Sequence, residues 1–314
     1  TFWINSHYEQ LKPRLRENPF NFPRFGEEGF SDLPTNGDWN KLDGKLVVGS
    51  ILELNKCLEA NPEFVQKVRT AFGRIGGLDL VSGGPPCQRF SMAGKREREN
   101  EKNALPWAFA KFVELSRPKI ALLENVSGIL RPFSGANGLK FHAWYEVAKV
   151  FSSIGYVPRC LHVNARFSGV AQNRPRFIMI AVRADHLDSI SHRFSPLEVK
   201  MFDEPLRFYG LVQTHQENLP FGHLDFMDLT HGAGISSAKE TFLSNLVDSS
   251  EISVAEAIDD LKIYNRSEPS GFVRRLNATF DRLHLDDAEG QEKLPLNHEQ
   301  RSNSEAVRRR FRLY

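Results

Sequence analysis

Residues 78–86 read LDLVSGGPP, a short apolar run that ends in two glycines and two prolines. A run of this length with turn residues behind it is typical of a buried strand. Apolar side chains at helical spacing follow over residues 105–113, and a second apolar run occupies residues 119–123. The order strand, helix, strand predicts that these segments belong to one α/β sheet.

The same alternation extends along the chain in both directions. We expect further helices at 64–72 and 141–154, and further strands at 46–48, 156–163 and 177–182. Alternating strands and helices predict an α/β fold with a doubly wound, mostly parallel sheet that carries helices on both faces.

Three regions follow from this pattern. Residues 1–44 have no sustained period and are expected to form an irregular extension, whereas residues 45–185 form the α/β core. Residues 186–314 are expected to form a second, smaller lobe, because no clean period is visible over 185–252. One short helix is predicted in this lobe at 254–261.

The composition is that of a globular protein with balanced charge. The 314 residues include 41 Lys and Arg against 39 Asp and Glu, and 40% are hydrophobic. No apolar run reaches the ~18–20 residues that span a membrane, and the N-terminus lacks a signal-peptide pattern. Three cysteines are too few for a disulfide framework, and no metal-binding spacing of His or Cys occurs. We therefore expect a cytoplasmic protein without a membrane segment or a metal ion.

Reactive side chains lie at three strand ends, where open α/β sheets bind their ligands. Cys87 follows GGPP, and basic neighbours favour its thiolate, although a lone cysteine is most often a small buried apolar residue. Glu124 directly follows the run 119–123, and it is either an acid in a site, or a helix N-cap or structural partner of a nearby arginine.

The third end precedes the strand at 177–182. Arg174 and Arg176 are two residues apart, which places both on one face of an extended segment. They form either a fork for a phosphate or a base carbonyl, or a solvated pair on an edge strand. These three strand ends would place a thiolate, a carboxyl acid and an arginine fork on one rim. Such a set suits attack by the thiolate on an electron-poor ring that is protonated on nitrogen during the attack.

The residues at these three ends resemble the motifs of a known family, the cytosine-C5 methyltransferases. Residues 83–94 are similar to the nucleophile loop of that family, and Glu124-Asn125-Val126 to its Glu-Asn-Val motif. Residues 172–176 match its Gln-x-Arg-x-Arg motif, and the order and spacing agree. The resemblance implies the Rossmann-like fold of S-adenosylmethionine-dependent methyltransferases.

The resemblance also implies a role for each motif. Cys87 would add to C6 of a flipped-out cytosine while Glu124 engages N3, and Arg176, helped by Arg174, would steady the O2 side of the ring. C5 would then take a methyl group from S-adenosylmethionine. The expected substrate is double-stranded DNA, and the expected enzyme is of the prokaryotic restriction-modification or phage type.

Two sets of binding residues are implied as well. The cofactor set comprises Gly49, Ser50, Ile51, Gly83 and Pro85. The substrate set comprises Pro86, Gln88, Arg89, Ser91, Asn125, Val126 and Gln172.

The chain departs from the family pattern on the cofactor side. Ser50 stands where the family usually has an aspartate that holds the adenine. The Phe-x-Gly-x-Gly turn of the family is absent before Lys45, and its closing Gly-Asn-Ser/Ala-Val element is absent from the C-terminal region. We expect truncation first, and otherwise a split enzyme completed by a second chain, or a degenerate copy.

Two alternatives to the DNA methyltransferase therefore stay open. The same catalytic motifs would serve a tRNA cytosine-C5 methyltransferase. The missing cofactor turn would also fit a catalytically inactive DNA-binding or partner subunit.

Overall fold

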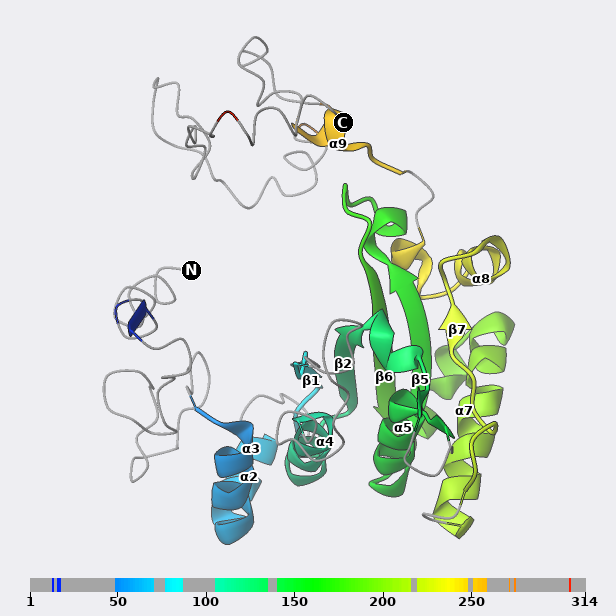
Figure 1. Cartoon of the computed structure of the whole chain (residues 1–314). Helices are drawn as coiled ribbons and strands as arrows, with labels where there is room; N and C mark the ends of the chain where they lie inside the picture. Colours follow the sequence, from blue (N-terminus) through cyan, green and yellow to red (C-terminus); the bar gives the residue numbers. More distant parts are fainter. Residues whose placement is uncertain are drawn as a thin grey trace. The chain divides into compact units, whose positions relative to one another are not determined.

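The computed structural model describes residues 49–70, 77–86, 105–134, 140–215, 219–247 and 251–258, with single positions at 13, 16, 17, 271, 274 and 305. The chain divides into two units, residues 1–253 and 254–314. The first unit carries the sheet (Figure 1). The described part of the second unit contains helix α9, Val254–Ile258, within the predicted helix at 254–261.

Among the described residues, five strands form the main sheet, in the order β1-β2-β6-β5-β7. Strand β1 is parallel to β2, and β5 is parallel to β7, whereas β6 is antiparallel to both of its neighbours. Four strands therefore share one direction, which confirms the predicted α/β fold with a mostly parallel sheet. In chain order the strands are β1 (Leu80–Gly83), β2 (Ile120–Val126), β5 (Tyr156–Asn164), β6 (Pro175–Arg183) and β7 (Met227–Asp228).

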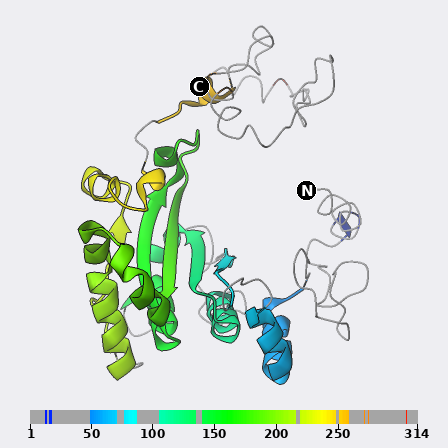
Figure 2. The same ribbon diagram turned by 180° about the vertical axis from the view of Figure 1, so that it is seen from behind.

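Helices lie on both faces of this sheet, which Figures 1 and 2 view from opposite sides. They are α2 (Ile51–Ala60), α3 (Pro62–Thr70), α4 (Leu105–Ser116), α5 (Ala143–Ser153), α6 (Ala184–Ile190), α7 (Pro196–His215) and α8 (Gly232–Ala238). Strand β3 (Phe133–Ser134) pairs antiparallel with β4 (Lys140–Phe141) in a second, two-stranded sheet. No helix in these described ranges is both long and apolar enough to cross a membrane.

Alternation along the strands gives each face of the sheet its own core. On one face, buried side chains of the strands such as Leu123 and Phe177 pack with Phe109 of α4 and with Trp144 and Phe151 of α5. On the other face, Leu161 of β5 packs with Ala238 of α8, and Val182 of β6 packs with Leu187 of α6 and Phe202 of α7. The two faces together fix the strands that carry the reactive residues.

The predicted helices and strands of the core are found wherever the structure describes them. Two expectations extend beyond the described residues: the strand at 46–48 lies outside them, and the helix at 64–72 is seen as α3 up to Thr70. Helix α2 was not predicted. The boundary expected near residue 185 stays a prediction.

Helices α6, α7 and α8 lie over residues 184–238, where the sequence shows no clean hydrophobic period and no helix was predicted. Helix α7 starts with a capping box: the Ser195 N–H donates to the Glu198 carboxylate at 2.8 Å, and the Glu198 N–H donates to Ser195 Oγ at 3.3 Å. Pro196 occupies the first helical position, which proline favours. This local signal, rather than the hydrophobic period, marks the helix in the sequence.

Pro205 lies inside α7 and has no N–H to donate to the carbonyl of Met201, four residues earlier. Arg159 of β5 supplies a donor instead, because its Nη1 lies 3.1 Å from Met201 O. The Arg159 side chain is only 7% exposed, so this hydrogen bond joins the sheet to α7 in a buried place. A helix that contains a proline is thereby held against β5.

We expect Arg159→Met to lower the free energy of unfolding by about 1–3 kcal/mol, because it leaves the Met201 carbonyl without its donor. In a Pro205→Ala background the loss should be smaller by about 1 kcal/mol, since the substituted alanine can donate its N–H within the helix. Urea unfolding of the two single variants and the double variant measures this coupling. Strictly additive losses would contradict the proposed link between Arg159 and Pro205.

Candidate active site

Two neighbouring strands bring the first two reactive ends together. In the parallel pair of β1 and β2, Gly83 lies opposite Leu123, so Gly84 and Glu124 follow at the same edge. A Cβ added to Gly84 would lie 3.2 Å from Glu124 Oε2. Glycine at this position therefore lets the backbone approach the carboxylate closely.

Asn125 connects β2 to the segment that leads to the predicted nucleophile. Its Nδ2 donates to Pro85 O at 3.2 Å, and its Oδ1 accepts from the Val126 N–H at 2.8 Å. Only 3% of Asn125 is exposed. The backbone is therefore held two residues before Cys87.

Part of the predicted catalytic and substrate sets lies outside the described residues: Cys87, Gln88, Arg89 and Ser91. Pro86, the last described residue of this segment, is exposed. Two other cysteines are described. Burial raises the pKa of the Cys160 thiol to about 12, so it stays protonated near neutral pH and is no nucleophile. Cys57 packs in an apolar cluster with Leu54 and Leu58.

The third reactive end meets the second through the antiparallel pairing of β2 and β6. Val126 lies opposite Arg176 and Glu124 opposite Ile178, so Glu124 and Arg176 are diagonal neighbours on one face. Arg176 Nε lies 2.6 Å from Glu124 Oε1. The Nε–H is not directed at an acceptor, so the contact is an ion pair and not a hydrogen bond. Arg176 Nη1 also donates to Pro175 O at 2.8 Å.

This pair is open to a ligand on the Glu124 side. The Glu124 side chain is 42% exposed and that of Arg176 is 18% exposed. The sequence left open that Glu124 only pairs with an arginine. It does pair with one, but that arginine is Arg176, which is itself a predicted site residue.

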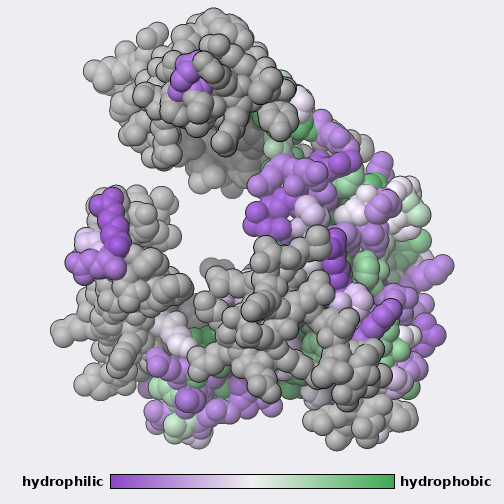
Figure 3. Space-filling view, in the orientation of Figure 1, coloured by the Kyte–Doolittle hydropathy of each residue, from purple (hydrophilic) through white to green (hydrophobic). Residues whose placement is uncertain are grey.

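Of the two arginines in the predicted fork, the structure pairs Arg176 with Glu124 and shows no such contact for Arg174. Arg174 and Gln172 are exposed and precede β6. Figure 3 shows hydrophilic and hydrophobic residues side by side on the surface of the described part of the chain. The prediction missed one residue here, Asn164, whose amide contacts this segment.

A second group of predicted residues lines one cleft of about 310 Å³. Gly49, Ser50, Ile51 and Gly83 all border it, whereas Pro85 does not. The remaining walls come from residues that were not predicted as binding residues: Leu54, Val81, Ser82, Phe109 and Phe112. Aromatic and apolar walls with small residues at a strand end suit a flat heterocycle such as adenine.

Ser50 has a structural role at the mouth of this cleft. It is the N-cap of α2, and its Oγ accepts from the Leu52 N–H at 3.2 Å. A serine hydroxyl also carries a hydrogen that it can donate to a ligand. The same side chain can therefore cap the helix and contact a bound molecule.

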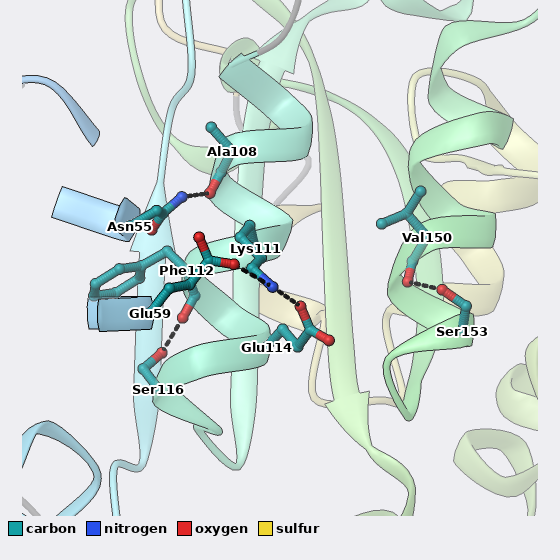
Figure 4. Close-up of polar contacts among 9 residues, drawn as sticks. All are labelled: Asn55, Glu59, Ala108, Lys111, Phe112, Glu114, Ser116, Val150 and Ser153. Carbon is teal, nitrogen blue, oxygen red and sulfur yellow. Dashed lines mark hydrogen bonds and ion pairs between the residues drawn. The ribbon is translucent and has the colours of Figure 1, made fainter. Parts of the chain in front are cut away.

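Helices α2 and α4 form the two helical walls of the cleft and are fastened to each other (Figure 4). Asn55 Nδ2 donates to Ala108 O at 2.8 Å, and Asn55 is 5% exposed. Lys111 Nζ lies 2.9 Å from carboxylates of both Glu59 and Glu114, and these hydrogen bonds raise the pKa of Lys111. The contacts that join the two helices, Asn55 to Ala108 and Lys111 to Glu59, therefore set the width of the cleft, whereas Glu114 pairs with Lys111 within α4.

The described ranges contain no group of three His, Cys, Asp or Glu side chains that could hold a metal ion.

Comparison with known proteins gives a family match over most of the chain. The family model for C-5 cytosine-specific DNA methylases matches residues 50–303. The chain is 35% identical over 111 residues to the type II methyltransferase M.DdeI of Desulfomicrobium norvegicum, covering 35% of this chain and 26% of that protein. It is 40% identical over 106 residues to the type II methyltransferase M1.HphI of Haemophilus parahaemolyticus, covering 33% and 27%.

The chain is also similar to a phage protein, with about the same sequence identity as to M.DdeI. The orphan methyltransferase M.SPRI of Bacillus phage SPR is 35% identical over 113 residues, which cover 36% of this chain and 24% of that protein. The chain thus matches about a quarter of the length of each of these three relatives.

Gly83 borders the cleft at a position where β1 and α4 leave no room for a side chain. A Cβ there would lie 2.5 Å from Cε2 of the buried Phe109 ring. We expect Gly83→Ala to lower the free energy of unfolding by about 1–3 kcal/mol through overpacking.

Gly210 of α7 offers a matched control, because a Cβ there would have no atom within 4 Å. Gly210→Ala should be neutral or stabilise by up to about 1 kcal/mol, as alanine favours a helix. Denaturant unfolding compares the two variants. Equal stability of Gly83→Ala and the unmodified chain would show that β1 and α4 are not in close contact at the cleft.

Proposed function

Since the chain belongs to the family of C-5 cytosine-specific DNA methylases, we propose that it methylates C5 of a flipped-out cytosine in double-stranded DNA. The observation that carries this proposal is the Glu124–Arg176 pair beside the Gly84-Pro85-Pro86 segment that leads to Cys87. The similar bacterial and phage proteins are named as type II or orphan methyltransferases, which supports an enzyme of the restriction-modification or phage type.

Cys87 acts as the nucleophile in this proposal. Its thiolate forms a bond to C6, and the electron pair of the C5–C6 double bond moves into the ring toward N3 and O2. Glu124, which is paired with Arg176 in the free chain, would carry a proton in the complex and donate it to N3, so the negative charge of the ring is neutralised as it forms. C5 then becomes nucleophilic and would take the methyl group as the bond between that methyl and the sulfonium sulfur of the donor breaks, with the electron pair staying on sulfur. The C5 proton would pass to water and N3 would return its proton to Glu124, while the electron pair of the C5–H bond re-forms the C5–C6 double bond as the Cys87 thiolate leaves.

Arg176 would stabilise the negative charge that develops on the ring, at O2. It is held 2.6 Å from Glu124 by the register of β2 and β6, so a base that reaches Glu124 also reaches a guanidinium. A fixed positive charge next to O2 stabilises the electron-rich ring. Arg174, exposed and two residues away, is suited to a phosphate of the flipped nucleotide.

The cleft beside β1 is the proposed site of S-adenosylmethionine, which supplies the methyl group when bound. Gly49, Ser50, Ile51 and Gly83 would border it together with Phe109 and Phe112. Its volume of about 310 Å³ lies at the lower end of the range for ligand sites. We propose that a further segment or a second chain completes the wall that the Phe-x-Gly-x-Gly turn forms in the family.

Base flipping follows from the geometry of the substrate. C6 of cytosine cannot be reached inside a stacked duplex, so the base must leave the helix to meet Cys87 and Glu124. Pro86 and Gln172, both exposed, would then contact the base or its sugar, while Asn125, which is buried, would act by holding Pro85.

We expect a covalent adduct when the full chain is mixed with S-adenosylmethionine and duplex DNA in which every cytosine is 5-fluorocytosine. Fluorine cannot leave C5 as a cation, so the enzyme stays bound through Cys87 and migrates as a larger band on a denaturing gel. Full substitution of the DNA makes the assay independent of the target sequence.

The adduct should disappear in Cys87→Ala and persist in Cys57→Ala, which removes the partly exposed thiol of α2. A band that survives Cys87→Ala would refute the nucleophile. The absence of any band that depends on S-adenosylmethionine would favour an inactive partner subunit, and a band with 5-fluorocytosine tRNA alone would favour the RNA enzyme.

Glu124→Gln should slow adduct formation by ~10²–10⁴, the usual range for a positioned acid or base. The matched control is Glu114→Gln on α4, a half-exposed carboxylate that pairs with Lys111 away from the strand ends. It should change the rate by less than about twofold, as expected for a surface ion pair. A loss below about threefold for Glu124→Gln would remove this carboxyl from the proposed proton transfer.

A further inference from the structure

The connection between β5 and β6 ends in an unusual pairing. The last residue of β5, Asn164, lies opposite Pro175, the first residue of β6. This is a non-hydrogen-bonded pair, because the ladder bond beside it runs from the Ala165 N–H to Arg174 O at 3.2 Å, so the ladder needs no N–H from Pro175. The exposed residues that precede it, Gln172 to Arg174, have a further anchor to the sheet.

The Asn164 side chain supplies this anchor with three hydrogen bonds. Its Oδ1 accepts from the Arg174 N–H at 3.0 Å and from the Arg166 N–H at 3.2 Å. Its Nδ2 donates to Asn173 Oδ1 at 2.8 Å. Asn164 is 8% exposed, and both lone pairs of its amide oxygen are used.

Both backbone polar groups of Arg174 are hydrogen-bonded. Its carbonyl accepts from the Ala165 N–H at 3.2 Å, while its N–H donates to Asn164. Because Pro175 follows, the backbone of Arg174 is also restricted to extended conformations. Two residues later, β6 delivers Arg176 to Glu124.

We propose that Asn164 is a positioning residue that fixes the backbone of Arg174 relative to the Glu124–Arg176 pair. The inference rests on the proposed function, in which Arg174 contacts the flipped nucleotide. The Asn164 amide oxygen holds the Arg174 N–H, the backbone donor of the residue whose side chain would meet the substrate.

The chemistry of the side chain predicts which substitutions are tolerated. Asn164→Asp keeps an oxygen for both backbone N–H groups and loses only the donor to Asn173. Asn164→Ala loses all three hydrogen bonds. The turn offers a local control in Ser168, whose Oγ donates to Leu246 O at 3.0 Å and does not contact Arg174.

Amide hydrogen exchange of the full chain, resolved to single residues, tests the anchor itself. Asn164→Ala should speed exchange at Arg166 and Arg174 by about tenfold or more, because a lost hydrogen bond lowers the local opening free energy. Asn164→Asp and Ser168→Ala should leave exchange at Arg174 within about threefold of the unmodified chain. Unchanged exchange at Arg174 in Asn164→Ala would overturn the proposal.

The covalent trap with 5-fluorocytosine DNA, at saturating DNA, tests the consequence. Asn164→Ala should slow adduct formation by about 10- to 100-fold, the cost of a misplaced contact, and Asn164→Asp should restore most of the rate. An equal loss in Ser168→Ala would show that the turn needs only general stability and would overturn the positioning role. If the unmodified chain forms no adduct, the proposed function fails, and the exchange comparison alone decides whether Asn164 holds Arg174.

Discussion

The antiparallel pairing of β6 is the constraint on which the rest of the described sheet depends. Strands β1 and β2 form one parallel pair and β5 and β7 form another, and β6 is the strand that joins these pairs. It pairs with β2 along all of β2 and with β5 along all of β5. The same strand places Arg176 beside Glu124, so the ladder that holds the sheet together also sets the distance between the two charges.

The charges of the site contribute little to the stability that positions them. An ion pair as exposed as Glu124 and Arg176 is worth at most about 1 kcal/mol. The strands beneath them are fixed by buried side chains such as Leu123 and Phe177, both 0% exposed. The pair is therefore oriented by packing on the opposite face of the sheet, and a base that displaces part of the ion pair would not loosen the fold.

The sequence predicts the fold well where strands and helices have a clear hydrophobic period. It also predicts the meeting of Glu124 and Arg176, because motifs at strand ends of one sheet lie at one edge. Helix α7 escaped prediction, since Pro205 argues against a helix and only the tertiary donor Arg159 compensates for it. The cap formed by Ser195 and Glu198 was the available local signal.

The roles of single polar residues were harder to predict. Asn164 ends a strand, and nothing in its sequence neighbourhood distinguishes it from an ordinary turn residue until the structure brings the Arg174 N–H to its amide oxygen. Phe109 and Phe112 were predicted to lie on an apolar helix face, and only the placement of β1 and α2 shows that they border a cleft. These roles depend on partners from distant parts of the chain. Hydrophobic periodicity within one segment does not show which distant residues will be its neighbours.

The hydrogen bond from Asn125 to Pro85 has a consequence for motion. Because it holds the peptide oxygen of Pro85, a rearrangement that carries Cys87, the proposed nucleophile, toward or away from a base would rotate about bonds after that point. Two residues of extended chain reach about 7 Å at most, which limits the distance between the Cα atoms of Pro85 and Cys87. In the proposed mechanism, chain length would therefore limit the range of the attack.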